Sequence, residues 1–173
     1  MMSELGRLVK DRSGSAAAEM ALVVPFLLVL MLGAIDLGNY FMSEHVIEKS
    51  VRDAARYAAR LPMTSYDCGS NTVDSTSQTQ IEKVARTGDP NGTTPKLPGW
   101  TADGMASVSL VCDTDTTNIY VNKGVYDGFP DGGAVPVVTV SATVPYNTLF
   151  GVIGLGAVSL NLKSQSQAAV IGA

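Results

Sequence analysis

The sequence is poor in the residues on which most enzyme and nucleic-acid chemistry depends. Only one histidine and one tryptophan occur in 173 residues, and just 16% of the chain is charged, against roughly 25% in typical soluble domains. Lysine and arginine form no run, and the net charge is −4. A nucleic-acid partner is therefore not expected, because phosphate binding needs a clustered basic surface.

Motifs for catalysis and cofactor binding are missing as well. The sequence contains no phosphate-binding P-loop, no zinc-ligand spacing and no catalytic triad, and His45 has no nucleophile beside it. Asp113, Asp115 and Asn118 are rich in oxygen, but the glycine and terminal glutamate of an EF-hand loop are missing, so we interpret them as a turn. We expect no enzyme activity, no catalytic residue, no cofactor and no metal.

What the sequence does have is one long apolar segment near its N-terminus. The stretch Ser15–Leu37 is interrupted only by Glu19 and bounded by Asp36, and as a helix it would span about 35 Å, enough to cross a bilayer core. A secretory signal would carry its small-residue cleavage site after the apolar run, whereas Ala16–Ala18 come before it. A buried core helix is the alternative, but no second helix of similar apolarity could pack against it. We expect a transmembrane helix.

The two cysteines, Cys68 and Cys112, both follow this segment. A pair on the non-cytoplasmic side suits a disulfide in an oxidising compartment, and the loop-entropy model gives such a crosslink on the order of 3–4 kcal/mol. Two unrelated buried thiols are the alternative.

Basic residues occur on both sides of the apolar run, at Arg7, Lys10 and Arg12 and again at Lys49, Arg52 and Arg56. The basic residues alone therefore do not decide the orientation of the helix. The cysteines favour a cytoplasmic N-terminus, because both follow the apolar run and a disulfide needs an oxidising compartment.

The helical pattern continues beyond the apolar run. No glycine or proline occurs from Asn39 to Arg60, and Pro62 supplies a stop. One apolar stripe repeats at spacings of four and three residues, at Ile47, Val51, Ala54, Ala58 and Leu61. The pattern predicts a continuous helix over Ser15–Leu61, lipid-soluble in its first half and amphipathic in its second.

Glu19 is the candidate functional residue of the apolar segment, because burying a carboxylate at the edge of an apolar helix costs free energy unless a partner compensates its charge. Its context is Gly14-Ser15-Ala16-Ala17-Ala18-Glu19. A glycine five residues before a glutamate at the start of a hydrophobic segment resembles a type IV prepilin processing site. With the helix that follows and its VRDAARYAAR stretch, residues 12–61 resemble the TadE-like minor pilins of the tight-adherence (Tad/Flp) pilus system.

That resemblance implies specific roles. A prepilin peptidase would cut after Gly14 and make Ser15 the new N-terminus, and Glu19 would pair with the freed amine of a neighbouring subunit. The partners implied are other pilin subunits, the peptidase, the inner-membrane assembly platform and membrane lipid. The protein would sit in the bacterial inner membrane with its C-terminal part outside the cytoplasm, and from there act in assembly or enter the pilus. Met20 is a departure, since members often carry tyrosine after the glutamate. An uncleaved, membrane-anchored binding or adhesion module is the alternative.

The remaining chain alternates between turn-rich and strand-like segments. A short helix is predicted at Ser77–Thr87 and strands at Ala106–Cys112, Asn118–Asn122, Val135–Tyr146 and Val158–Ala169. Val158, Leu160 and Leu162 are expected on one strand face, Trp100 in the core, and Leu149–Leu155 as a buried connector rather than a loop towards the membrane.

These elements predict a pilin-like α+β fold, in which a long N-terminal helix packs on a small antiparallel sheet. The expected divisions are a leader at 1–14, a transmembrane helix at 15–38, an amphipathic extension at 39–62 and an extracytoplasmic β-rich domain at 63–173.

Overall fold

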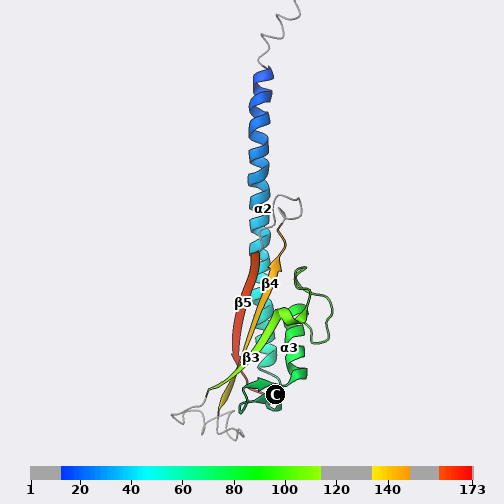
Figure 1. The fold of residues 1–173 in the computed structure, drawn as a ribbon, viewed down its shortest axis with the longest axis vertical. Helices are drawn as coiled ribbons and strands as arrows, with labels where there is room; N and C mark the ends of the chain where they lie inside the picture. The colour runs from blue at the N-terminus through cyan, green and yellow to red at the C-terminus, as the bar shows by residue number, and fades with distance from the viewer. Residues whose placement is uncertain (1–12, 114–133, 149–159, 173) are drawn as a thin grey trace, which may run out of the picture.

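The structure, a computed structural model, describes residues 13–113, 134–148 and 160–172. It consists of one long helix, whose first half stands alone, and a small head built around the second half (Figure 1). Most of the expected leader, the strand expected at Asn118–Asn122 and the connector Leu149–Leu155 lie outside the described residues. The α+β prediction, with a long helix packed on an antiparallel sheet, is confirmed.

The long helix α2 spans Ser13–Ala58, 46 residues in all, and includes Pro25. It ends close to where the sequence predicted. The backbone N–H of Leu61 bonds the carbonyl of Ala58 over 3.1 Å, which tightens the last turn, and Pro62 cannot continue the helix. The single helix predicted for the apolar and amphipathic segments is therefore present, with ends that differ by two or three residues from Ser15 and Leu61.

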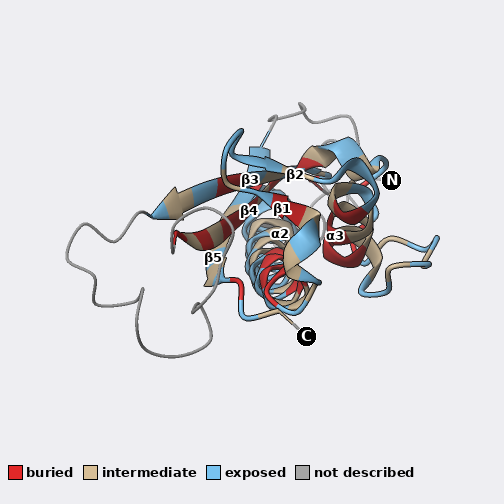
Figure 2. Ribbon diagram, turned by 90° about the horizontal axis from the view of Figure 1, so that it is seen from below, coloured by how far each residue is buried: buried red, intermediate tan, exposed pale blue. Residues whose placement is uncertain are grey.

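The second half of α2 forms the centre of the core. Ile47, Val51, Ala54 and Ala58 are all completely buried, and Leu61 packs at their edge. These are the residues of the predicted apolar stripe. Seen along α2 in Figure 2, helix α3 lies to one side and the strands lie across another, so the buried residues of α2 face both.

Three antiparallel strands make the main sheet, in the order β3-β4-β5: β3 at Ala106–Asp113, β4 at Val135–Tyr146 and β5 at Leu160–Ala169. Every second residue of β4 is buried against the helices, as the alternation predicted, at Val138, Val140, Ala142 and Val144. On β5 the prediction holds only in part. Leu162 is buried opposite Val144, but Leu160 is 41% exposed because it pairs with Tyr146, where the core has ended.

A second, two-stranded sheet closes the far end of the head. Strands β1 (Tyr66–Asp67) and β2 (Thr72–Val73) pair with each other, and a disulfide joins Cys68 in the turn between them to Cys112 on β3. This is the pairing that the positions of the two cysteines favoured. The backbone N–H of Cys112 also donates to the side-chain oxygen of Asn71 over 3.3 Å. The hairpin is thus tied to the main sheet by a covalent bond and a hydrogen bond.

Helix α3 spans Ser75–Thr87 and begins two residues before the predicted start. Asp74 caps it by accepting hydrogen bonds from two backbone N–H groups of the first turn. The chain that follows α3 is held against it by the ion pair of Arg86 with Asp103. This segment carries Trp100, which is completely buried as predicted.

Candidate functional site

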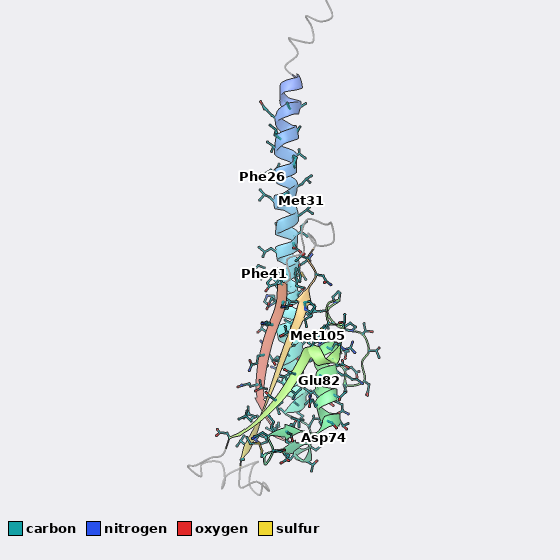
Figure 3. The ribbon with its side chains drawn as sticks, in the orientation of Figure 1. Phe26, Met31, Phe41, Asp74, Glu82 and Met105 are labelled. Atoms are coloured by element: carbon teal, nitrogen blue, oxygen red, sulfur yellow. A yellow bond between two sulfur atoms is a disulfide. The ribbon has the colours of Figure 1, made fainter. Side chains whose placement is uncertain are left out.

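The first half of α2 is apolar on all sides and has almost nothing packed against it. It contains the one helix segment, among the described residues, that is long and apolar enough to cross a membrane, and only 6% of its most apolar stretch is buried. Leu22 is 82% exposed and Phe26 65% exposed. Figure 3 shows Phe26 and Met31 projecting from this half of the helix, away from the head. A helix that is apolar all round is matched to lipid or to other apolar helices, not to water.

The charged residue at the start of this half is Glu19. It lies exposed in the early turns of α2, and it makes no ion pair with any residue that the structure describes. The backbone of Gly14 and Ser15 belongs to the first turn of the same helix. Glu19 comes five positions after Gly14 on the helix, which corresponds to an axial rise of about 7.5 Å. The structure thus places all three predicted residues at one end of α2.

A second acidic residue, Asp36, closes the apolar half at its other end, and there it meets the head. The hydroxyl of Tyr146, the last residue of β4, lies 3.0 Å from the Asp36 carboxylate oxygen Oδ1 and 2.9 Å from the Asp36 backbone oxygen. Burial, together with this hydrogen bond, raises the pKa of Tyr146 to about 12. The phenol therefore keeps its neutral, donating form to a higher pH than an ordinary tyrosine.

A tyrosine of α2 completes this junction. The ring of Tyr40 meets that of Tyr146 edge to face, with the ring centres 5.3 Å apart and the planes at 84°, a favoured geometry for aromatic pairs. The Tyr40 hydroxyl donates to Glu44 over 3.1 Å, and this bond raises the pKa of Tyr40. The end of β4 is thus held against α2 at the point where the apolar half finishes.

Sequence reasoning did not find this junction. The signal available was Asp36, an acid at the end of an apolar run that calls for a partner just as Glu19 does. Its partner Tyr146 lies 110 residues away along the chain, so no local pattern could identify it.

Beyond the junction, the second half of α2 carries its charges on the face away from the core. Glu48 and Arg52 form an ion pair one turn apart, with both side chains about half exposed, and this i,i+4 spacing supports the helix. Within the described ranges, no group of three or more histidine, cysteine, aspartate or glutamate residues is placed to hold a metal ion. His45 is exposed on α2.

Comparison with models of known protein families gives a match that falls on this helix. Residues 14–56 match the model of a family described as TadE-like protein. The match begins at Gly14, includes Glu19 and Asp36, and stops within the last turn of α2. No curated protein and no solved structure matches the chain.

Proposed function

We propose that this chain, a TadE-like protein of the Tad pilus system by the family match over residues 14–56, is a minor pilin or pseudopilin. In this role it acts in assembly or initiation of an adhesive Tad-type pilus. One observation carries the proposal. The apolar half of α2 projects from the head as a bare helix, and this is a surface that both a bilayer and a bundle of like helices would accept.

Processing after Gly14 is the first step of the proposed role. The prepilin peptidase would release residues 1–14 and leave Ser15 as the N-terminus, with the transmembrane helix over 15–38. The register supports this proposal, because Gly14, Ser15 and the apolar run follow one another without a break on α2. The family match, which starts at Gly14, supports it as well.

Glu19 would then provide the specificity of assembly. An acidic side chain within a membrane span is costly, by about 2.5–3.5 kcal/mol at the helix centre on insertion scales. Glu19 has no cation among the described residues, so the amine freed at Ser15 of a neighbouring subunit would offset that cost. A subunit without Glu19 would insert more easily but would lose the pairing that selects its position in a helix bundle.

The proposed orientation places the N-terminus in the cytoplasm and the head, residues 63–173 with the amphipathic extension 39–62, on the other side of the bacterial inner membrane. The Cys68–Cys112 disulfide supports this, because such bonds persist in oxidising compartments and are rare in the cytosol. The inner-membrane assembly platform and other pilin subunits would meet the protein through α2.

The test is made in cells that express the peptidase and the rest of the pilus system. Mass spectrometry of the membrane-extracted protein should find a chain that starts at Ser15, and a Gly14 substitution should leave the leader in place. Glu19→Ala should reduce piliation while the protein still reaches the membrane. Glu48→Ala, which removes an exposed glutamate of the same helix outside the apolar half, should leave piliation unchanged. An intact leader in the native protein, or full piliation with Glu19→Ala, would contradict the proposal.

One observation favours a second candidate, an uncleaved anchored module that binds a partner through its head. The outer face of the sheet is left open and is lined by polar side chains, with the hydroxyls of Ser107 and Ser141 2.8 Å apart across β3 and β4. Such a protein would keep its leader and would tolerate Glu19→Ala, so the same two measurements separate the candidates.

A further inference from the structure

The head meets α2 at a depth that the length of the apolar half determines. From Ala16 to Asp36 the helix rises about 31 Å, close to the roughly 30 Å of a bilayer's hydrocarbon core. The interfacial layer on each side adds about 5–7 Å, or about four helical residues. If α2 spans the membrane, this layer begins directly after Asp36 and includes Tyr40.

The end of β4 is fixed at the same level. The hydroxyl of Tyr146 lies 3.0 Å from the Asp36 carboxylate, and Leu160 at the start of β5 pairs with Tyr146. The head therefore does not stand away from the membrane on a stalk, because its own strands reach the border of the apolar half. Figure 3 shows Phe41 at the level where β4 and β5 reach the helix.

We call this end of the head the head base; it comprises Phe41 and Met42 on α2, Tyr146 at the end of β4 and Leu160 at the start of β5. Exposed apolar side chains of the head gather there. Among the residues that the structure describes, the exposed large apolar ones after Leu37 are Phe41, Met42, Val111, Leu160 and Ile171. Three of these five belong to the head base: Phe41 at 55% exposure, Met42 at 70% and Leu160 at 41%.

Two hollows flank Tyr146 at the head base. One, of about 360 Å³, is lined by Gly33, Asp36, Leu37, Tyr40, Tyr146 and Leu160. The other, of about 300 Å³, lies between α2 and the loop around Pro98, and none of the described residues that line it is charged. The head base is thus largely apolar and hollowed, and its polar groups are the hydroxyls of Tyr40 and Tyr146, the Asp36 carboxylate and a few uncharged side chains such as Asn39 and Asn147.

We infer that the head base rests in the interfacial layer of the bilayer, with lipid covering Phe41, Leu160 and the two hollows. The inference rests on the membrane anchoring proposed above but not on the pilus role. Tyrosine is enriched at this depth because its ring is apolar and its hydroxyl polar, and here both tyrosine hydroxyls bond carboxylates. A protein partner is the competing occupant, but the continuity of the head base with the membrane span favours lipid.

Docking on lipid would set both the depth and the tilt of α2. A helix held only by its apolar length can tilt to match the bilayer, whereas interfacial anchors restrict that freedom. The head base lies on one side of α2, so it would make one orientation of the helix in the membrane preferred. This would present a defined face of the apolar half to neighbouring helices.

The experiment uses the full chain in vesicles of phosphatidylethanolamine and phosphatidylglycerol, without any pilus component. Both native cysteines are in the disulfide, so a single added cysteine can carry an environment-sensitive NBD label. Four variants are compared: Leu160→Cys at the head base, Asn147→Cys at the hollow near Pro98, which Asn147 lines, Phe26→Cys within the apolar half, and Val111→Cys at the far end of β3. All four positions are exposed, and the emission of the buried Trp100 checks that each variant is folded.

The inference predicts a graded result with nitroxide-labelled lipids. Labels at 160 and 147 should shift to shorter emission wavelengths on reconstitution and lose emission mainly with a nitroxide near the headgroup. The label at 26 should lose emission mainly with a deep nitroxide, and the label at 111 with neither.

Two outcomes overturn the inference, and they can be told apart. If the label at 26 is quenched but those at 160 and 147 behave like the label at 111, anchoring stands and lipid docking is wrong, leaving the head base free for a protein partner. If no label is quenched, the membrane anchoring fails together with the inference.

Discussion

Removing the Cys68–Cys112 disulfide is expected to destabilise the head by about 4 kcal/mol. The bond closes a loop with a sequence separation of 44 residues, which contains β2, α3 and the segment that carries Trp100. For a loop of this size the chain-entropy relation gives about 13 cal/mol/K, or about 4 kcal/mol at 25 °C. Replacing both cysteines by serine returns this conformational entropy to the unfolded chain and so lowers the free energy of unfolding by about 4 kcal/mol.

Urea unfolding of the full-length protein in detergent can measure this change. Trp100 is a suitable probe because it is completely buried and lies inside the crosslinked loop. With a denaturant dependence of about 2 kcal/mol per molar urea, the midpoint should fall by about 2 M. Wild-type protein reduced with dithiothreitol is the matched control, since it loses the crosslink without changing a side chain.

The two measurements together can refute the reasoning. If the loss comes from loop entropy, the reduced protein and the double serine variant should lose similar stability. A loss below about 1 kcal/mol in both would show that the bond does not restrict the unfolded chain as the entropy relation requires. A large loss in the serine variant alone would assign the effect to the local environment of the half-buried cysteines.

Three further predictions concern the head and use the same unfolding assay. Gly99→Ala should cost about 1–3 kcal/mol, because the new Cβ would clash with the backbone oxygen of Pro145. Gly104→Ala, with nothing within 4 Å of the new Cβ, should be near neutral, and equal losses would contradict the argument. Burial raises the pKa of Tyr66 to about 12, so the stability from its neutral form is complete below pH 10, and about 2 kcal/mol of it should be lost as the pH rises through 12. Tyr66→Phe should remove this part of the alkaline loss, and an unchanged pH dependence would refute it. Asp74→Ala should cost about 0.5–2 kcal/mol by leaving two N–H groups of α3 uncapped, whereas Asp74→Asn should retain most of that stability.

Features with a strong local period could be predicted from the sequence. The stripe Ile47, Val51, Ala54 and Ala58 repeats with the helical period and is completely buried, and β4 has the bounds that its alternation indicated. In both cases one side of the segment faces the core, so the spacing of its apolar residues along the sequence matches the period of the helix or strand.

Features set by contacts between distant segments could not be predicted. The strands β1 and β2 have two residues each, too few to show any period, and they depend on the disulfide and on β3. Leu160 has the residue type of a core position, but it lies beyond the place where the core ends.

The candidate site divides in the same way. Gly14, Ser15 and Glu19 lie within six residues and could be read as one motif, whereas the contact of Asp36 with Tyr146 joins the end of the apolar segment to the end of a strand.

The helix α2 passes from the apolar half into the core of the head without a hinge, and this has a mechanical consequence. Its second half is the centre of the core, and its last turn is joined to the C-terminal segment, where the backbone N–H of Ile171 donates to the carbonyl of Ala59 over 2.9 Å. The part of α2 that follows Pro25 is therefore expected to move together with the head. A push that raises the helix by one residue would lift the head by about 1.5 Å and, if the helix follows its own screw, turn it by about 100°. Any motor acting on the membrane end would be felt, as thrust and as torque, at the outermost strand.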